Sequence, residues 1–492
     1  MAALTRRTAL AAVAAAFPRI GRPQQRRPNV LFVMTDDQRY DAMSCAGNRF
    51  LQTPNMDRIA HEGVRFQNAF VTNSLCSPSR ATIVTGLYSH AHGVTTNGGT
   101  SHRLRPDQVT FPMLLRQSGY FTSLIGKWHI ASDPRGFDHW CILPGQGQYQ
   151  DPVMLVNGAR VQFRGQSEDV TGDQALETLR NRPKDKPFCM LYQFKAPHRD
   201  WRAAERFDYL YEDVRFPEPS TFHTGLSNRP TAVRDSDMQI ADMPDFAQRG
   251  VDPALPREER KRLNYQIFLR NYYRTLRGVD ENLGRVLDYL DREGLAENTL
   301  VIYTSDNGFF HGEYGMFDKR LMYEPSIRVP MLVRHPAGIR PGQVDSAHMV
   351  LNNDVAHTIL DYAGLSRPEW MRGHGESWKP VVEGKPVEWR DAWLYEYFEY
   401  PGPHCAGQIR GVRTQRWKLI HYIQKPQGHE LFDLESDPEE RRNLYDDPRF
   451  KQQVAELSAR LERFRDQLRD DRSVDNTPPP ECGGRMTGRR PD

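Results

Sequence analysis

The chain has 492 residues, enough for one large core and a smaller second domain. Charged residues make up 26% of it and the mean hydropathy is −0.70, values typical of a water-soluble protein. The net charge of +3 is too near balance to favour a nucleic-acid partner or a membrane surface.

The N-terminus has the pattern of an export signal. Two adjacent arginines in residues 5–8 (TRRT) precede a short, Ala-rich apolar segment over residues 9–17. The arginine pair favours the twin-arginine route, and the alternative is a disordered basic tail. We predict a signal peptide and leader over residues 1–27 and an exported protein, periplasmic or extracellular. No other apolar run approaches the roughly 18 residues that span a bilayer.

Four apolar runs end in polar, reactive side chains. Runs that are apolar on both faces predict buried strands of a largely parallel sheet, and sites form beyond the carboxyl ends of such strands. Residues 30–34 lead to Asp36 and Asp37, and residues 119–125 lead to Lys127 and His129. The other two end in His198, after residues 187–194, and in Asp306 and Asn307, after residues 299–304. Residues 330–334 predict a fifth strand.

Residues 76–86 (CSPSRATIVTG) predict a helix that starts next to a thiol. Pro78 suits the first helical position, and Ser77 or Ser79 can cap the free N–H groups. A nucleophile at Cys76 would lie where a helix favours negative charge, with Arg80 pointing a cation at an anion. The alternative is a buried cysteine before a capped helix.

The remaining segments have weaker patterns. Residues 111–118 and 264–293 predict amphipathic helices, the latter with Glu281 and Asn282 in solvent. His90 and His92 are treated as loop residues because no acid spacing around them matches a metal site. Residues 202–260 are polar and Pro-rich, which predicts an irregular insertion near the mouth of the site.

The pattern changes near residue 375. Alternating segments at 393–400, 409–413 and 418–422 predict antiparallel strands, followed by a charged helix at about 448–469. We therefore predict an α/β catalytic domain over 28–375 with a mostly parallel sheet between helices. A C-terminal subdomain of antiparallel sheet plus helix follows over 376–470, and then a disordered tail over 471–492.

The string C-x-P-S-R, followed by T-G, resembles the signature of the type I sulfatases of the alkaline phosphatase superfamily. Residues 119–129 (GYFTSLIGKWH) resemble the second sulfatase signature, and the resemblance extends over residues 28–470. It implies that a formylglycine-generating enzyme oxidises Cys76 to Cα-formylglycine before export, and that the hydrate of this aldehyde is the nucleophile. Five cysteines then remain, an odd number, and their pairing stays open.

The resemblance also implies a cation site and a set of catalytic roles. Asp36, Asp37, Asp306, Asn307 and modified Cys76 would hold Ca²⁺, with Mg²⁺ as the alternative, because these oxygen ligands are hard. The cations that would neutralise the sulfate are Arg80, Lys127 and Lys319. His198 would protonate the leaving alcohol and His129 would accept a proton; His311 and Glu324 are left without a role.

Residues 195–201 (KAPHRDW) and the region 395–404 are most similar to bacterial glycan sulfatases of the N-acetylglucosamine-6-sulfatase type. We expect a sulfated carbohydrate substrate, for example 6-O-sulfated N-acetylglucosamine, with contacts from His404 and Arg413. Two alternatives are a phosphonate monoester hydrolase or phosphodiesterase of the same superfamily, and a non-catalytic glycan-binding protein with unmodified Cys76.

Overall fold

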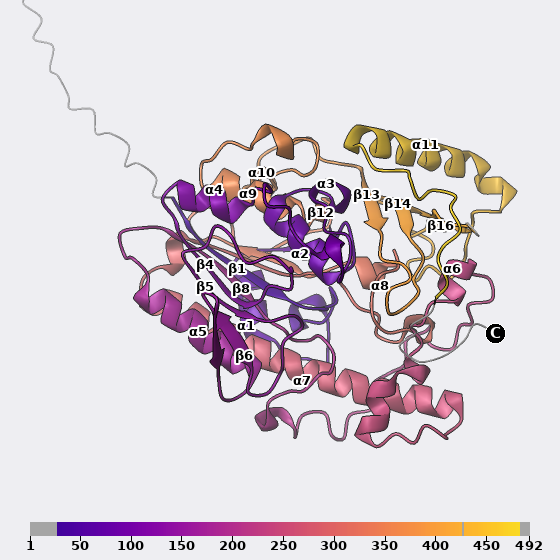
Figure 1. Cartoon of the computed structure of the whole chain (residues 1–492), viewed down its shortest axis with the longest axis horizontal. Coiled ribbons are helices and arrows are strands. Elements are labelled where there is room, and N and C mark those ends of the chain that lie inside the picture. The colour runs from indigo at the N-terminus through magenta and orange to yellow at the C-terminus, as the bar shows by residue number, and fades with distance from the viewer. Residues whose placement is uncertain (1–26, 426–427, 483–492) are drawn as a thin grey trace, which may run out of the picture.

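The computed structural model describes residues 27–425 and 428–482 (Figure 1). Apart from Arg27, the predicted signal peptide and leader lie outside the described residues. None of the helices in the described ranges combines the length and the apolar character that a membrane crossing needs.

A ten-stranded mixed sheet forms the centre of the molecule, in the order β11-β2-β10-β9-β1-β8-β4-β5-β6-β7. Its middle strands β9, β1, β8, β4 and β5 are parallel, while β10 and β6 are antiparallel to their neighbours. This confirms the predicted mixed, mostly parallel sheet. The ten strands are β1 (Asn29–Thr35), β2 (Val64–Phe66), β4 (Phe121–Lys127), β5 (His139–Leu143), β6 (Val153–Val156), β7 (Ala159–Gln162), β8 (Phe188–Gln193), β9 (Thr299–Ser305), β10 (Met331–Arg334) and β11 (Gln343–Asp345).

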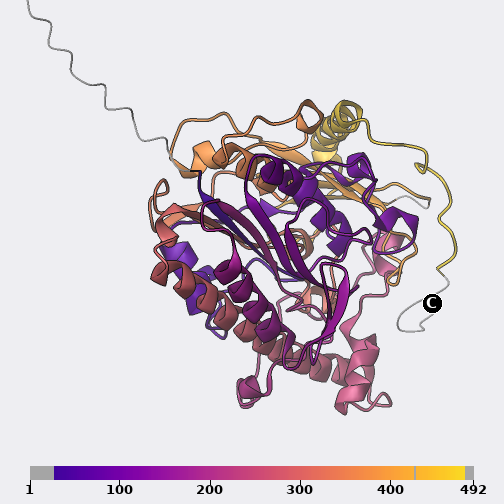
Figure 2. The same ribbon diagram turned by 60° about the vertical axis from the view of Figure 1, so that its left-hand side comes forward.

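Helices cover both faces of this sheet, which is why its strands are continuous apolar runs. In β1, Leu31 and Val33 pack into one core, and Val30, Phe32 and Met34 pack into the other. The first core lies under α1 (Pro54–His61), α5 (Ser167–Asn181) and α7 (Arg257–Arg292). The second lies under α2 (Cys76–Thr85), α4 (Phe111–Gln117), α9 (Asp354–Tyr362) and α10 (Lys379–Val382). Figures 1 and 2 show α5 and α7 side by side along one face.

The C-terminal part adds the predicted antiparallel sheet, which has a fourth strand, β16, beyond the three predicted segments. Its strands are β13 (Ala392–Tyr397), β14 (Ile409–Thr414), β15 (Trp417–Tyr422) and β16 (Gly428–Asp433). Helix α11 (Lys451–Leu468) packs on one face of it. On the other face, Trp393, Tyr395 and Tyr397 pack against residues of the larger domain, among them Phe70 and Tyr323. The remaining elements are β3 (Ala69–Phe70), β12 (Val350–Leu351), α3 (Ser89–His92), α6 (Thr231–Arg234) and α8 (Glu324–Ile327).

Several local predictions differ from the structure. The long helix starts at Arg257, and Asn282 is buried rather than solvated, since its amide donates to Asp169 Oδ1 over 2.8 Å. His90 and His92 lie in the short helix α3, where His90 Nδ1 is 2.6 Å from Glu396 Oε2, an acid distant in sequence. Part of the predicted tail, residues 471–482, has a defined path, and Cys482 forms a disulfide with Cys405.

Candidate active site

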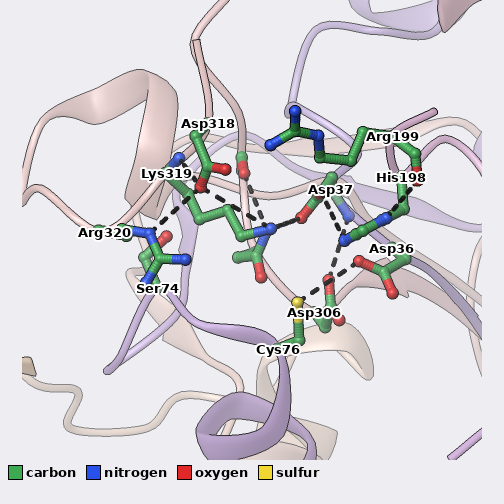
Figure 3. A network of polar contacts seen from close by, with 12 residues as sticks. Asp36, Asp37, Ser74, Cys76, His198, Arg199, Asp306, Asp318, Lys319 and Arg320 are labelled. Carbon is green, nitrogen blue, oxygen red and sulfur yellow. Dashed lines mark hydrogen bonds and ion pairs between the residues drawn. The ribbon is translucent and has the colours of Figure 1, made fainter. Parts of the chain in front are cut away.

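The carboxyl ends of β1, β4, β8 and β9 meet at one edge of the sheet, because these strands are parallel neighbours. Thr35 pairs with Ser305, so the acids that follow both strands lie close together. The N-terminus of α2 faces the same edge and brings Cys76 beside them (Figure 3). Segments more than 200 residues apart in sequence thus converge on one buried cluster.

Cys76 is the first residue of α2 and is fully buried, with Sγ 3.7 Å from Asp36 Oδ1. Burial, reinforced by the charge of Asp36, raises the pKa of this thiol well above its ordinary value. The unmodified side chain is therefore a neutral thiol at physiological pH. Because the thiolate is the reactive form of cysteine, the site as it stands holds no cysteine nucleophile.

The helix begins two residues earlier than the proline position predicts, and no side chain caps it at its N-cap residue, Leu75. Instead, the N–H of Ser77 donates to Asn97 Oδ1 over 3.0 Å. The Ser77 hydroxyl lies 2.7 Å from His102 Nε2 and 3.3 Å from His129 Nδ1. Asn97 and His102 were not expected here, since both lie in a loop without a sequence pattern of its own.

Three carboxylates crowd the cluster, with oxygens of Asp36, Asp37 and Asp306 within 4.8 Å of one another. The amide nitrogen of Asn307 donates to Asp37 Oδ1 over 2.6 Å, which fixes the orientation of the amide. Asp37 Oδ2 and Asn307 Oδ1 are buried and have no hydrogen-bond partner among the residues that the structure describes. Such orphaned hard oxygens fit a divalent cation of the Ca²⁺ or Mg²⁺ type.

The pKa shifts of the three carboxyl groups reflect their burial and the negative charge crowded around them. Burial, together with Asp36 and Asp306, raises the pKa of Asp37 to about 7, although Lys319 opposes the shift. Burial and Asp36 also raise the pKa of Asp306. Burial acts in the same sense on Asp36, but Lys127 and other nearby cations outweigh it and hold the pKa of that carboxyl well below its ordinary value. A bound cation would favour the ionised form of all three.

Each predicted sulfate-binding cation contacts a carboxylate of the cluster. Arg80 Nε donates to Asp306 Oδ2 over 2.8 Å, and its Nη2 lies 3.1 Å from Asp36 Oδ2. Lys127 Nζ forms an ion pair with Asp36, and Lys319 Nζ lies 2.6 Å from Asp37 Oδ1 (Figure 3). Three side-chain cations thus lie beside three acids.

Two histidines flank the cluster. His198 Nε2 lies 3.9 Å from Asp37 Oδ2, and His129 lies beside the hydroxyl of Ser77. Burial and the charge of Lys127 lower the pKa of both rings well below the ordinary value, so both are neutral at pH 7. In this state each ring has one nitrogen that accepts a proton.

The two residues predicted to contact the sugar are paired with protein groups. His404 is 1% exposed, with Nδ1 2.7 Å from the carbonyl oxygen of Asp237 and Nε2 3.0 Å from Asp318 Oδ2. Arg413 Nε donates to Glu324 Oε1 over 3.0 Å. The same oxygen lies 2.9 Å from Lys418 Nζ, so Glu324 belongs to a buried ion-pair network below the C-terminal sheet.

His311 packs edge-on against Tyr272, with ring centroids 4.5 Å apart. Burial lowers its pKa well below the ordinary value. Its position next to the aromatic residues of α7 indicates a packing role.

The fold and site are those of an α/β protein with a buried cluster of acids and cations at its strand ends, and comparisons with known proteins make it a sulfuric ester hydrolase. A family model described as Sulfatase matches residues 28–365, and one described as "N-sulphoglucosamine sulphohydrolase, C-terminal" matches residues 312–467. The chain belongs to the sulfatase family.

Among its relatives is an N-acetylglucosamine-6-O-sulfatase of Bacteroides thetaiotaomicron, 40% identical over 91% of this chain and 88% of that protein. The human N-acetylglucosamine-6-sulfatase is 32% identical over 76% of this chain and 67% of its own length. A solved structure of a protein "in complex with its substrate D-Glucosamine-2-N, 6-O-disulfate" superposes with a TM-score of 0.83 at 39% identity, over 91% of this chain and 99% of that one.

Proposed function

We propose that this enzyme hydrolyses the sulfate ester of a sulfated glycan, with 6-O-sulfated N-acetylglucosamine as the expected substrate. The relatives named for this sugar support the choice, since one of them matches along nine-tenths of the chain. The observation that carries the proposed chemistry is the position of Cys76, buried at the head of α2 among three acids and three cations. Such a thiol serves better as the precursor of formylglycine than as a nucleophile itself.

Asp36, Asp37, Asp306 and Asn307 would hold the divalent cation, Ca²⁺ or Mg²⁺. When bound, it supplies positive charge to the sulfate oxygens, and the modified residue 76 supplies an aldehyde hydrate as nucleophile. Asp37 Oδ2 and Asn307 Oδ1, which have no hydrogen-bond partner within the described ranges, support this assignment.

The chain's own cations prepare the site for an anion. Arg80, Lys127 and Lys319 lie on different segments and are held by ion pairs, so their charges are fixed before a sulfate arrives. Charges fixed in advance stabilise a developing negative charge without reorganisation. We expect these three side chains to bind the non-bridging oxygens of the sulfate.

His198 is the proposed proton donor to the leaving alcohol. A bound sulfate adds negative charge beside the ring and raises its pKa, so that Nε2 can carry the proton that the alcohol takes. His129, on the Ser77 side of Cys76, is the proposed acceptor of the proton that the modified residue must lose in each turnover.

We infer that a formylglycine-generating enzyme modifies Cys76 before the chain folds, because the residue is fully buried after folding. On the predicted twin-arginine route the chain is exported folded, so the modification then precedes export. The exported, periplasmic or extracellular location remains the prediction of the N-terminal segment. The division into a catalytic domain over 28–375 and a C-terminal subdomain over 376–470 is likewise proposed from the sequence pattern.

Mass spectrometry of the peptide that carries Cys76, from protein made in the native host, tests the proposal. We expect the mass of formylglycine in place of cysteine, together with release of sulfate from 6-O-sulfated N-acetylglucosamine. A wholly unmodified thiol without turnover would support a glycan-binding protein instead.

The phosphonate alternative shares the fold, since a phosphonate monoester hydrolase of Agrobacterium radiobacter superposes with a TM-score of 0.69 at 23% identity. Parallel assays of an aryl sulfate and an aryl phosphonate monoester separate the two functions by the ratio of their kcat/KM values. A higher value for the phosphonate would contradict the sulfatase proposal.

A further inference from the structure

The loop between β13 and β14, residues 398–408, extends from the C-terminal sheet to the candidate active site. Two of its side chains, Glu399 and His404, are buried and contact the residues on either side of Lys319. His404 Nε2 lies 3.0 Å from Asp318 Oδ2, and Glu399 forms an ion pair with Arg320. The loop that leaves the C-terminal sheet therefore contacts the Lys319 segment at both of its neighbours, Asp318 and Arg320.

Glu399 also reaches the helix that carries Cys76. The N–H of Asn97 donates to Glu399 Oε1 over 3.0 Å, and the side-chain oxygen of Asn97 accepts from the N–H of Ser77 over 3.0 Å. Ser77 follows Cys76 directly in the chain. One carboxylate thus connects the neighbour of Cys76 with the neighbour of Lys319.

The backbone on both sides of Lys319 needs such support. Asp318 has φ +72° and Arg320 has φ +83°, a region that residues other than glycine rarely adopt. Conformations of this kind persist only where the surrounding structure over-determines them. The contacts of Glu399 and His404 give part of this support. Strand β13 adds another, because Arg320 Nη1 donates to Tyr397 Oη over 2.9 Å.

Contacts with other segments hold the loop of residues 398–408 in place. Asp237, from the insertion between β8 and α7, exchanges two hydrogen bonds of 2.7 Å with His404, one through the ring and one between backbones. The next residue, Cys405, is disulfide-bonded to Cys482 near the end of the described chain, 77 residues later. This cross-link ties the residue next to His404 to the C-terminal end of the described chain.

We propose that Glu399 and His404 are positioning residues of the sulfatase reaction, which hold Lys319 against Asp37 and beside Cys76, and that the Cys405–Cys482 disulfide keeps their loop in place. The proposal rests on the function proposed above for Cys76 and Lys319. It assigns to the loop of the C-terminal sheet a direct part in building the catalytic centre.

A double-mutant cycle tests this coupling. Glu399→Gln, Lys319→Ala and their combination are assayed on 6-O-sulfated N-acetylglucosamine, after mass spectrometry has shown equal formylglycine content. We expect Glu399→Gln to lower kcat by about 10- to 100-fold with less than about a threefold change in KM, since positioning acts on the transition state. If Glu399 acts through Lys319, the double variant is no slower than Lys319→Ala alone.

The proposal would be overturned if the fold-reductions in kcat of the two single variants multiplied in the double variant. A wild-type kcat in Glu399→Gln would overturn it as well. Full turnover in Lys319→Ala would overturn both the positioning role and the assignment of Lys319. Glu383→Gln is the matched control, because Glu383 pairs at the surface with Lys385 and should leave kcat unchanged.

A second variant keeps the test decisive if Glu399→Gln does not fold. Cys482→Ser removes the disulfide without changing a residue of the candidate active site, and we expect kcat to fall by about 2- to 10-fold. Dithiothreitol should lower the kcat of the wild type to the same level and leave that of Cys482→Ser unchanged. An unchanged kcat in both experiments would contradict the role given to the disulfide.

Discussion

The imidazole Nδ1 of His198 lies 2.5 Å from the backbone carbonyl oxygen of Arg199. A carbonyl only accepts hydrogen bonds, so Nδ1 carries the hydrogen and the neutral ring presents Nε2 as its acceptor. That nitrogen faces the acid cluster, 3.9 Å from Asp37 Oδ2. The carbonyl thus sets both the tautomer and the direction of the ring.

We therefore predict that His198→Ala lowers kcat on a glycan sulfate by about 10²- to 10⁴-fold, the contribution typical of general acid catalysis. An alkoxide is a poor leaving group and needs the proton, whereas 4-nitrophenolate leaves without it. The loss should therefore be much smaller with 4-nitrophenyl sulfate. Equal losses on both substrates would contradict the role of proton donor, and His348→Ala, at a half-buried surface position beside Asp345, serves as the control.

The cation assignment predicts the behaviour of Asp306→Asn. The amide oxygen still accepts the hydrogen bond of Arg80, while the amide nitrogen replaces the acceptor of the longer bond, 3.2 Å, from the N–H of Asp37. The variant also removes one charge from the cluster, so we expect it to fold, to lose bound Ca²⁺ and to have a kcat at least about 100-fold lower. Asp306→Ala is a poorer test, because it removes a partner of the buried Arg80 and is expected to be strongly destabilising. Metal analysis and thermal unfolding of the same preparation check both parts.

Chelation offers an independent measurement. Treatment with EDTA should abolish turnover of the wild type, and added Ca²⁺ or Mg²⁺ should restore it. The ion that restores more activity at equal concentration identifies the preferred metal. Asp306→Asn with wild-type metal content and turnover would refute the assignment.

The sequence predicted the meeting of the strand ends because two simple patterns carry that information. Apolar runs mark buried parallel strands, and polar residues at their ends must then share one edge of the sheet. Asp36, Lys127, His198 and Asp306 were all placed in this way. The motif around Cys76 predicted the helix α2 and the thiol at its N-terminus.

The contacts that surround this centre could not be predicted in the same way. Asn97, His102 and Glu399 lie in loops, where no period fixes the direction of a side chain, and their partners are distant in sequence. The burial of His404 depends likewise on Asp237 and Asp318, which reach it from two other segments. Only the packing of distant segments against one another decides such contacts.

Gly126, in β4, and Gly119, two residues before that strand, provide a paired test of the packing of β4. Both have positive φ, +103° and +98°, but a Cβ at Gly126 would lie 1.8 Å from the carbonyl oxygen of Gln193, whereas Gly119 has open space. We predict that Gly119→Ala costs about 1–2 kcal/mol of unfolding free energy, the penalty of a left-handed backbone. Gly126→Ala should cost about 3–5 kcal/mol, because strand β8 must also move. Urea unfolding measures both, and equal losses would contradict the close packing of β4 against β8.

His374 predicts a pH dependence of stability away from the candidate active site. It lines a cavity of about 910 Å³ whose walls include Trp393 and Phe464, and the N–H of Tyr88 donates to its Nδ1 over 3.4 Å. Burial, with the charge of His90, lowers the pKa of His374 to about 4. Between pH 6.5 and 4 the unfolded chain therefore binds a proton that the folded chain does not.

The unfolding free energy contributed by His374 is thus fully present above pH 6.5 and is lost progressively as the pH falls toward 4. Between pH 7 and pH 5 the loss amounts to about 2 kcal/mol. His374→Asn cannot take up the proton, so its unfolding free energy should fall less than that of the wild type by this amount. Urea unfolding of both proteins at the two pH values measures the difference. Parallel declines would show that the ring already accepts a proton in the folded protein, and that the cavity admits enough water to solvate its charge.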